Sequence, residues 1–201
     1  MGNALRFDEI ATLPAALGSA VLPLAAYWNR DIYEWTKDQV GGDLAPFEHV
    51  RDVLNLVPEF GFLVAEVASL DAAPKLRGYT IFLPLNADGH SALKSGDFNG
   101  AAVEDRFLTA SGQRADALYW WCTVAPSAVS LGMVAVVSQL QKEHVRRAPI
   151  YTKPVNEHAE QLARFAGFEP TAAGASYKNA GLFVYERSAV RSEAAGLRGA
   201  A

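Results

Sequence analysis

The chain has 201 residues, of which half are apolar and a fifth are charged, so its length and composition are those of one ordinary globular domain. This balance excludes the polar, charge-rich composition of a disordered chain. The formal net charge is −4 and acidic and basic residues are interspersed, which excludes the basic surface of a nucleic-acid-binding protein.

The N-terminal third is predicted to be helical. Residues 11–27 are apolar but are interrupted by two prolines, so we expect neither an export signal nor a membrane-spanning helix. Apolar residues recur at helical spacing over 20–40, and a glycine pair ends that helix. A second amphipathic helix is predicted for 43–57, where the next proline stops it.

Shorter segments with the composition of strands follow. Residues 60–70 and 76–85 are rich in β-branched and aromatic residues, and the turn-like stretch between them predicts a β-hairpin. The next stretch, 86–116, is polar with four glycines and is predicted to hold one short helix at 101–108. A connection of this length is typical of a functional lid or a family-specific insertion. We call residues 86–116 the excursion.

Residues 117–126 form a nearly continuous apolar run, which predicts a strand buried on both faces at the centre of a sheet. The remaining predicted elements are a buried helix at 127–145, a short strand at 148–154, a helix at 156–168 and closing strands at 168–173 and 181–187. Together these elements predict an α/β layer architecture in a single domain of residues 1–188, with a flexible tail at 189–201.

Cysteine and histidine usage limits the chemistry. Cys122 is the only cysteine, so no intramolecular disulfide can form and we expect a reducing, cytoplasmic location. We interpret it as a small apolar side chain of the strand, since the sequence places no histidine beside it to activate a nucleophile. The four histidines share no ligand spacing, and we expect no metal site.

The junction of the central strand and the buried helix is a candidate phosphate site. The first N–H groups of a helix lack partners and lie at the positive end of its dipole. Ser127 or Ser130 could cap this helix, and Gly132 would allow a ligand to approach the main chain. The alternative is an ordinary packed joint between a strand and a helix.

The stretch NEHAEQLARFAGF at 156–168 favours the phosphate site over the packed joint. Its residues Asn156, Ala159, Leu162, Gly167 and Phe168 resemble the N-x-x-A-x-x-L-Y-x-x-x-G-F signature of the GCN5-related N-acetyltransferase (GNAT) superfamily. The resemblance covers about residues 117–187. It implies a mixed, mostly antiparallel central sheet flanked by helices, with two central strands that splay apart, and it implies acetyl-CoA or another acyl-CoA as co-substrate.

The resemblance also implies where the acyl-CoA would bind. The pantetheine arm would lie in the gap between the splayed strands, and an N–H near Thr123 or Val124 would stabilise the oxyanion. The pyrophosphate would contact Val129, Ser130, Leu131, Gly132, Met133 and Val134. Asn156 would bind the pantetheine arm or order a water molecule, and its alternative role is an N-cap of the helix that starts there.

Two positions depart from the family pattern. Only Gly132 survives of the usual phosphate loop, and the motif tyrosine, which commonly protonates the leaving thiolate, is Ala163. Tyr151 and Tyr177 are the candidate acids, and half-buried packing is the alternative role of each.

Acidic and basic side chains leave further alternatives open. The candidate bases are Glu66, Glu104 and Asp105, although a solvated surface position explains Glu66 equally well. The cations that could reach the 3′-phosphate of coenzyme A, or simply face solvent, are Lys142, Arg146, Arg147 and Lys153.

The leading hypothesis is therefore an N-acyltransferase that moves an acyl group from acyl-CoA to an amine by direct attack. A small-molecule amine is favoured over a protein as acceptor, with no membrane partner, and the enzyme would be a monomer or a homodimer. One alternative is a catalytically degenerate GNAT-fold protein that binds a ligand or a partner. Another is an acyltransferase that takes its acyl group from an acyl carrier protein.

Overall fold

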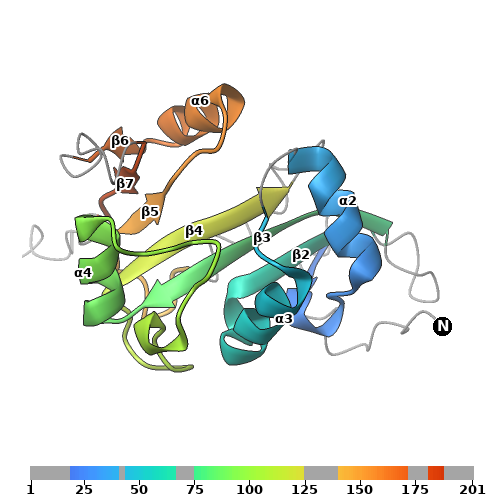
Figure 1. Cartoon of the computed structure of the whole chain (residues 1–201), viewed down its shortest axis with the longest axis horizontal. Helices are drawn as coiled ribbons and strands as arrows, with labels where there is room; N and C mark the ends of the chain where they lie inside the picture. The colour runs from blue at the N-terminus through green and yellow to red at the C-terminus, as the bar shows by residue number, and fades with distance from the viewer. Residues whose placement is uncertain (1–18, 41–43, 67–74, 125–139, 172–180, 188–201) are drawn as a thin grey trace, which may run out of the picture.

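The structure, a computed structural model, describes residues 19–40, 44–66, 75–124, 140–171 and 181–187. Within these ranges seven strands form one sheet in the order β1-β2-β3-β4-β5-β7-β6 (Figure 1). The strands are β1 (Ser19–Pro23), β2 (Gly61–Glu66), β3 (Lys75–Leu85), β4 (Ala117–Val124), β5 (Ile150–Thr152), β6 (Glu169–Pro170) and β7 (Phe183–Tyr185). Only β4 and β5 run parallel, and all other neighbours are antiparallel.

Helices flank this sheet. The α-helices of the described ranges are α2 (Arg30–Val40), α3 (Phe47–Leu56), α4 (Ala87–Ser95) and α6 (Glu157–Phe165). The 3-10 helices are η1 (Leu24–Ala26), η2 (Pro58–Phe60) and η3 (Asp105–Phe107). The predicted α/β class, with a mostly antiparallel sheet flanked by helices, is thereby confirmed. None of the helices in the described ranges has the length and apolar character needed to cross a bilayer.

The prediction of one helix over 20–40 is wrong at its start. Residues Ser19–Pro23 form an edge strand that pairs with β2, and α2 begins only at Arg30. Asn29 defines this start because its Oδ1 accepts a hydrogen bond from the N–H of Ile32 at 3.0 Å. Pro23 cannot stand inside a helix, and Leu22 is fully buried in the sheet, which explains why a strand forms here.

The predicted hairpin and second helix are confirmed as β2–β3 and α3, but the helix of the excursion lies elsewhere. α4 starts directly after β3, where Asn86 Oδ1 accepts a hydrogen bond from Gly89 N at 2.9 Å, and it ends at Gly96, whose φ of 84° is left-handed. Only the 3-10 helix η3 lies in the range predicted to be helical, 101–108. The cap is hard to find in the sequence because the residues after Asn86 carry no apolar repeat.

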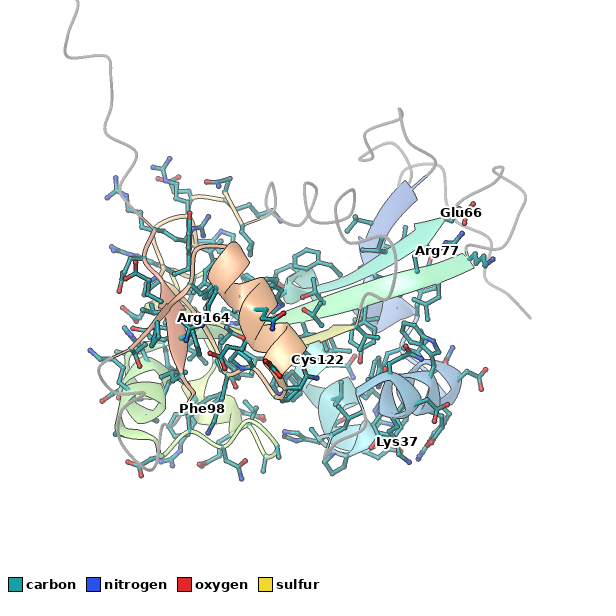
Figure 2. All side chains as sticks on the ribbon, turned by 90° about the horizontal axis from the view of Figure 1, so that it is seen from above. Lys37, Glu66, Arg77, Phe98, Cys122 and Arg164 are labelled. Atoms are coloured by element: carbon teal, nitrogen blue, oxygen red, sulfur yellow. The ribbon has the colours of Figure 1, made fainter. Side chains whose placement is uncertain are left out.

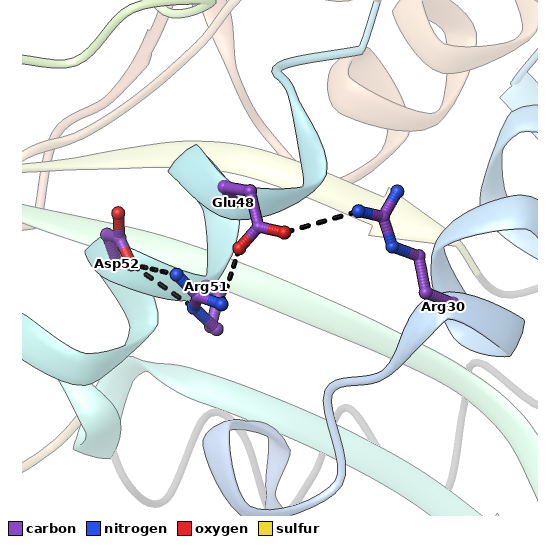
Figure 3. Close-up of polar contacts among 4 residues, drawn as sticks. All are labelled: Arg30, Glu48, Arg51 and Asp52. Atoms are coloured by element: carbon purple, nitrogen blue, oxygen red, sulfur yellow. Dashed lines mark hydrogen bonds and ion pairs between the residues drawn. The ribbon is translucent and has the colours of Figure 1, made fainter.

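Helices α2, α3 and α4 cover one face of the sheet, which we call the helical face (Figure 1). An exposed ion-pair network links α2 to α3. Arg30 Nη2 lies 3.2 Å from Glu48 Oε1, and Arg51 pairs with both Glu48 and Asp52 (Figure 3). Because water and salt screen exposed charges, this network contributes little to stability. The Arg30 guanidinium also lies 4.3 Å from the centre of the Phe47 ring, and the Tyr33 ring stands edge-on to Phe47, so aromatic packing joins the two helices as well.

The helix of the 156–168 stretch is confirmed as α6, at the β5–β7–β6 end of the sheet (Figure 1). Asn156 caps it, since its Oδ1 accepts a hydrogen bond from Ala159 N at 2.8 Å. Gly167 ends it with a left-handed φ of 88°, and Phe168 is buried in the core, both as predicted. The predicted helix at 127–145 lies mostly outside the described residues, and its last part, 140–145, forms turns.

Candidate functional site

The parallel pair of β4 and β5 is short, and β4 continues beyond it. Three residue pairs join the two strands, from Leu118–Ile150 to Trp120–Thr152. β4 runs on to Val124, so its residues 121–124 face no described strand on the β5 side. We call these residues the open segment. Because main-chain groups alternate in direction along a strand, some N–H and C=O groups of the open segment point away from β3, on the side where no described strand lies.

Two local features explain why the pairing ends. The register between β3 and β4 shifts between Ile81 and Phe82, which leaves Trp121 as a β-bulge with no opposing residue on β3. A bulge bends and twists its strand, and this one lies at the first residue of the open segment. Along the chain after β5, Pro154 has no N–H, so it cannot donate a hydrogen bond that would extend the ladder.

Burial along β4 follows the same division. The strand is central, as predicted, but the prediction that it is buried on both faces throughout is wrong. Residues 117–119 and Val124 are buried, whereas residues 120–123 are only half-buried. The half-buried part comprises Trp120 and three of the four residues of the open segment.

A chain of three polar side chains lies on the helical face of the open segment. Thr36 Oγ1 donates a hydrogen bond to Ile32 O at 2.7 Å, so the Tyr79 hydroxyl must donate to Thr36 Oγ1 at 2.8 Å. The oxygen of Tyr79 then accepts from the Cys122 thiol, with Oη and Sγ 3.6 Å apart. In this order the Cys122 thiol is the donor, and burial keeps it protonated, since the contact with Tyr79 by itself lowers the pKa of the thiol.

Burial disfavours the charged forms of both Tyr79 and Cys122. It raises the pKa of Tyr79 above its usual value and raises the pKa of Cys122 to about 11. The thiol is therefore neutral at physiological pH and is not an activated nucleophile. This agrees with the interpretation of Cys122 as a packed side chain of the strand.

Thr123 is held on the opposite face. The indole Nε1 of Trp120 donates to Thr80 Oγ1 at 2.7 Å and also contacts Thr123 Oγ1, and the two threonine hydroxyl oxygens lie 2.6 Å apart. Thr123 Oγ1 also lies 2.9 Å from Cys122 O, to which it can donate. Because these contacts occupy the hydroxyl, Thr123 has only its main chain to offer a ligand beside the open segment.

The excursion touches the open segment on the helical face. Trp121 Nε1 donates a hydrogen bond to Gly100 O at 2.6 Å, and Val103 N donates to His49 Nε2 at 2.9 Å. The His49 ring stands edge-on to the Trp121 ring, with 6.3 Å between ring centroids. The sequence did not indicate Trp121 or His49 as site residues, because a bulge and a contact between distant residues leave no local pattern.

Comparison with known proteins gives no assignment. No protein-family model matches the chain, and no curated protein matches its sequence. We therefore infer function from the geometry of β4 and β5 and from the sequence pattern that begins at Asn156.

The structure does not bring Glu66 to the open segment. Glu66 forms an ion pair with Arg77 at the far end of the β2–β3 hairpin, well away from Cys122 (Figure 2). In the register of the sheet, Glu66 lies opposite Lys75 of β3. Lys75 is four residues along β3 from Tyr79, which lies opposite Val124 of β4. At the rise of a strand, this is a separation of about 13 Å.

Tyr151 lies in the closed part of the strand pair. It is opposite Tyr119 and is buried, and its hydroxyl lies 3.0 Å from His90 Nε2 on α4. Burial raises the pKa of Tyr151 and lowers the pKa of His90, so a neutral hydroxyl donates to a neutral imidazole. This contact ties β5 to the excursion.

Several other predicted site residues can be placed. Asn156 and its neighbour Val155 are exposed, four and three residues after the end of β5. Glu104 and Asp105 are exposed in the excursion, where Glu104 pairs with Arg106. The predicted phosphate loop, residues 129–134, and Tyr177 lie outside the described residues. In the described ranges no three His, Cys, Asp or Glu side chains are grouped so that they could hold a metal ion.

A polar hollow of about 230 Å³ lies at the opposite end of β4. Its lining residues are Arg114, Ala115, Asp116, Glu143, His144, Arg146, Arg147 and Ala148. β4 has eight residues, so about 20 Å of strand separates this hollow from Val124. Arg146 and Arg147, two candidates for the 3′-phosphate, therefore lie far from the open segment.

Proposed function

We propose that the protein is an N-acyltransferase that transfers an acetyl or other acyl group from acyl-CoA to an amine. The observation that carries this proposal is the open segment, the four residues by which β4 outruns its pairing with β5. A strand edge inside a sheet exposes N–H and C=O groups that need hydrogen-bond partners. The amide groups of a pantetheine arm have the spacing and polarity of a short peptide strand, and they would supply those partners.

The arrangement of elements supports the same reading. Helices lie between β1 and β2, the sole parallel pair of the described sheet is central, and α6 follows β5 with an asparagine cap and a Gly-Phe end. These features accord with the GNAT resemblance of the sequence. The proposal extends it to a splayed β4–β5 pair whose gap holds the thioester.

The proposed reaction needs few protein groups. The amine nitrogen attacks the thioester carbonyl carbon, a C–N bond forms, the C–S bond breaks and the thiolate leaves. A main-chain N–H at Thr123 or Val124 would stabilise the oxyanion of the tetrahedral intermediate. The amine must lose a proton, to water or to a base that the described part of the gap does not include.

A second candidate function, ligand binding without turnover, is favoured by a specific observation. Ala163, at the place of the motif tyrosine, is buried in the core with 3% of its surface exposed. Glu66 and Tyr151 are held elsewhere by Arg77 and His90. Neither Glu66 nor Tyr151 is therefore available for proton transfer beside the open segment, and Tyr177, the other candidate acid, lies outside the described residues.

Hydrogen exchange with two ligands tests the proposal. Acetyl-CoA should bind saturably and slow the exchange of main-chain amides in residues 121–124. Adenosine 3′,5′-bisphosphate is the matched control, because it carries the nucleotide end of coenzyme A and has no pantetheine. It should leave these amides unchanged.

The outcomes separate the candidates. No saturable binding of acetyl-CoA at millimolar concentration, or binding that leaves residues 121–124 unprotected, would rule out the proposed cleft. If acetyl-CoA protects them, a panel of amines is then assayed by release of free thiol. Protection without thiol release from any amine would support the second candidate.

A further inference from the structure

Trp121 occupies the position at which β4 leaves β5. Trp120 is the last residue of β4 paired with β5, and Trp121 is the bulge that follows it. A bulged residue leaves the ladder, so its conformation depends on what its side chain contacts. Here the indole Nε1 donates to Gly100 O at 2.6 Å, which ties the bulge to the excursion.

A second contact joins the same part of the excursion to α3. Val103, three residues after Gly100, donates its N–H to His49 Nε2 on α3 at 2.9 Å. Because Nε2 accepts this hydrogen bond, neutral His49 carries its proton on Nδ1. The His49 ring packs edge-on against Trp121, with ring planes at 87°. The bulge is thus held between α3 and one turn of the excursion.

The excursion is itself anchored to the sheet. Leu108 forms an isolated bridge with Leu85 at the end of β3, and Asp116 N donates to Leu85 O at 2.8 Å. The ring of Phe98 packs on Tyr119 of β4, with 5.4 Å between centroids. These contacts fix the excursion to the end of β3 and to β4. The position of the Gly100 carbonyl is therefore set by the sheet.

We propose that Trp121 is a positioning residue of the acyl-CoA cleft, and that its bond to Gly100 holds β4 bent so that the open segment stays apart from the chain after β5. This inference rests on the proposed function, to which it adds a role for the excursion. The excursion does more than cover the helical face, because it sets how much of β4 is available to the thioester.

The test compares Trp121→Phe with Trp28→Phe. Trp121→Phe keeps an aromatic ring against His49 and removes the donor to Gly100. Trp28 is a matched control on the same face, because its buried Nε1 has no hydrogen-bond partner in the described part of the chain. Both variants lose the same atoms, and only one loses the tie to the excursion.

Two readouts are measured for each variant. The first is affinity for acetyl-CoA, which should fall about fivefold in Trp121→Phe, the effect of one lost hydrogen bond, and stay unchanged in Trp28→Phe. The second is amide exchange without ligand. Exchange at residues 121–124 should slow by roughly tenfold in Trp121→Phe, because a relaxed β4 gains partners from the chain after β5.

These readouts distinguish the two ideas. If the wild type does not bind acetyl-CoA, the proposed function fails, and the exchange data alone still decide whether Trp121 holds β4 open. Unchanged or faster exchange at residues 121–124 in Trp121→Phe would overturn the inference. His49→Phe, which removes the acceptor of Val103 and keeps a ring, gives a second measurement if Trp121→Phe does not fold. Slower exchange in that variant supports the inference, and unchanged or faster exchange overturns it.

Discussion

One side chain, Asn86, bonds to both ends of the first part of the excursion. Its Nδ2 donates to Arg106 O at 2.7 Å and to Leu108 O at 3.2 Å, while its Oδ1 accepts from Gly89 N at 2.9 Å. One residue thus caps α4 and closes the excursion. Asn86→Asp separates these roles, since the new carboxylate keeps the capping acceptor and loses both donors.

The expected losses follow from the bonds removed. A side-chain cap contributes about 1 kcal/mol. The bond to Leu108 is long and the bond to Arg106 is exposed, so the two together contribute about 1–2 kcal/mol. We expect Asn86→Ala to lower the free energy of unfolding by about 2–3 kcal/mol. Asn86→Asp should lower it by about 2 kcal/mol, because a carboxylate facing two carbonyl oxygens offsets its favourable interaction with the helix dipole.

Urea unfolding of the three proteins at pH 7 measures these losses, and amide exchange over residues 96–109 reports the excursion itself. Acidification supplies an internal control. The carboxyl group introduced by Asn86→Asp can donate one hydrogen bond once it is protonated, so the gap between wild type and this variant should narrow towards about pH 4. If Asn86→Asp cost less than about 0.5 kcal/mol at pH 7, the two donor bonds would not close the excursion, and the reasoning would be wrong.

Three further outcomes are expected. In Gly89→Ala the new Cβ would press on the main-chain oxygen of Phe107, so overpacking of about 1–3 kcal/mol should outweigh the gain in helix propensity of about 1 kcal/mol, and any rise in urea stability would contradict this. The pKa of Cys122 is raised from its usual 9 to about 11, so the contribution of the neutral thiol to stability is complete below pH 9 and is lost as pH rises through about 11. Wild type should therefore lose stability to urea relative to Cys122→Ala over that pH window. Plots of urea stability against pH that run parallel for the two proteins would refute this. Asn156→Ala should lower the free energy of unfolding by about 1 kcal/mol through loss of the cap, whereas Asn156→Asp should lower it little. Both variants should weaken acetyl-CoA binding if the amide contacts pantetheine. Wild-type affinity in Asn156→Asp would show that the residue acts as a cap alone.

Local patterns in the sequence predicted the elements that short-range physics determines. Asn156 and Gly167 mark the ends of α6 because a cap and a left-handed residue act within one helical turn. The hairpin of β2 and β3 was evident from composition because β-branched and aromatic residues suit a pleated sheet. The central place of β4 also followed, since a continuous apolar run needs neighbours on both sides.

Contacts between distant residues decided the rest. Leu22 belongs to a strand because it pairs with Leu63, although its own neighbours have helical spacing. The bulge at Trp121 lies in the register of β3 and β4, and its indole donates to a carbonyl of Gly100. The residues around Trp121 reveal neither contact. The sequence alone thus predicted a central strand and a shorter strand after it, and only the tertiary structure decided where their pairing stops, because pairing and its interruption depend on groups far apart along the chain.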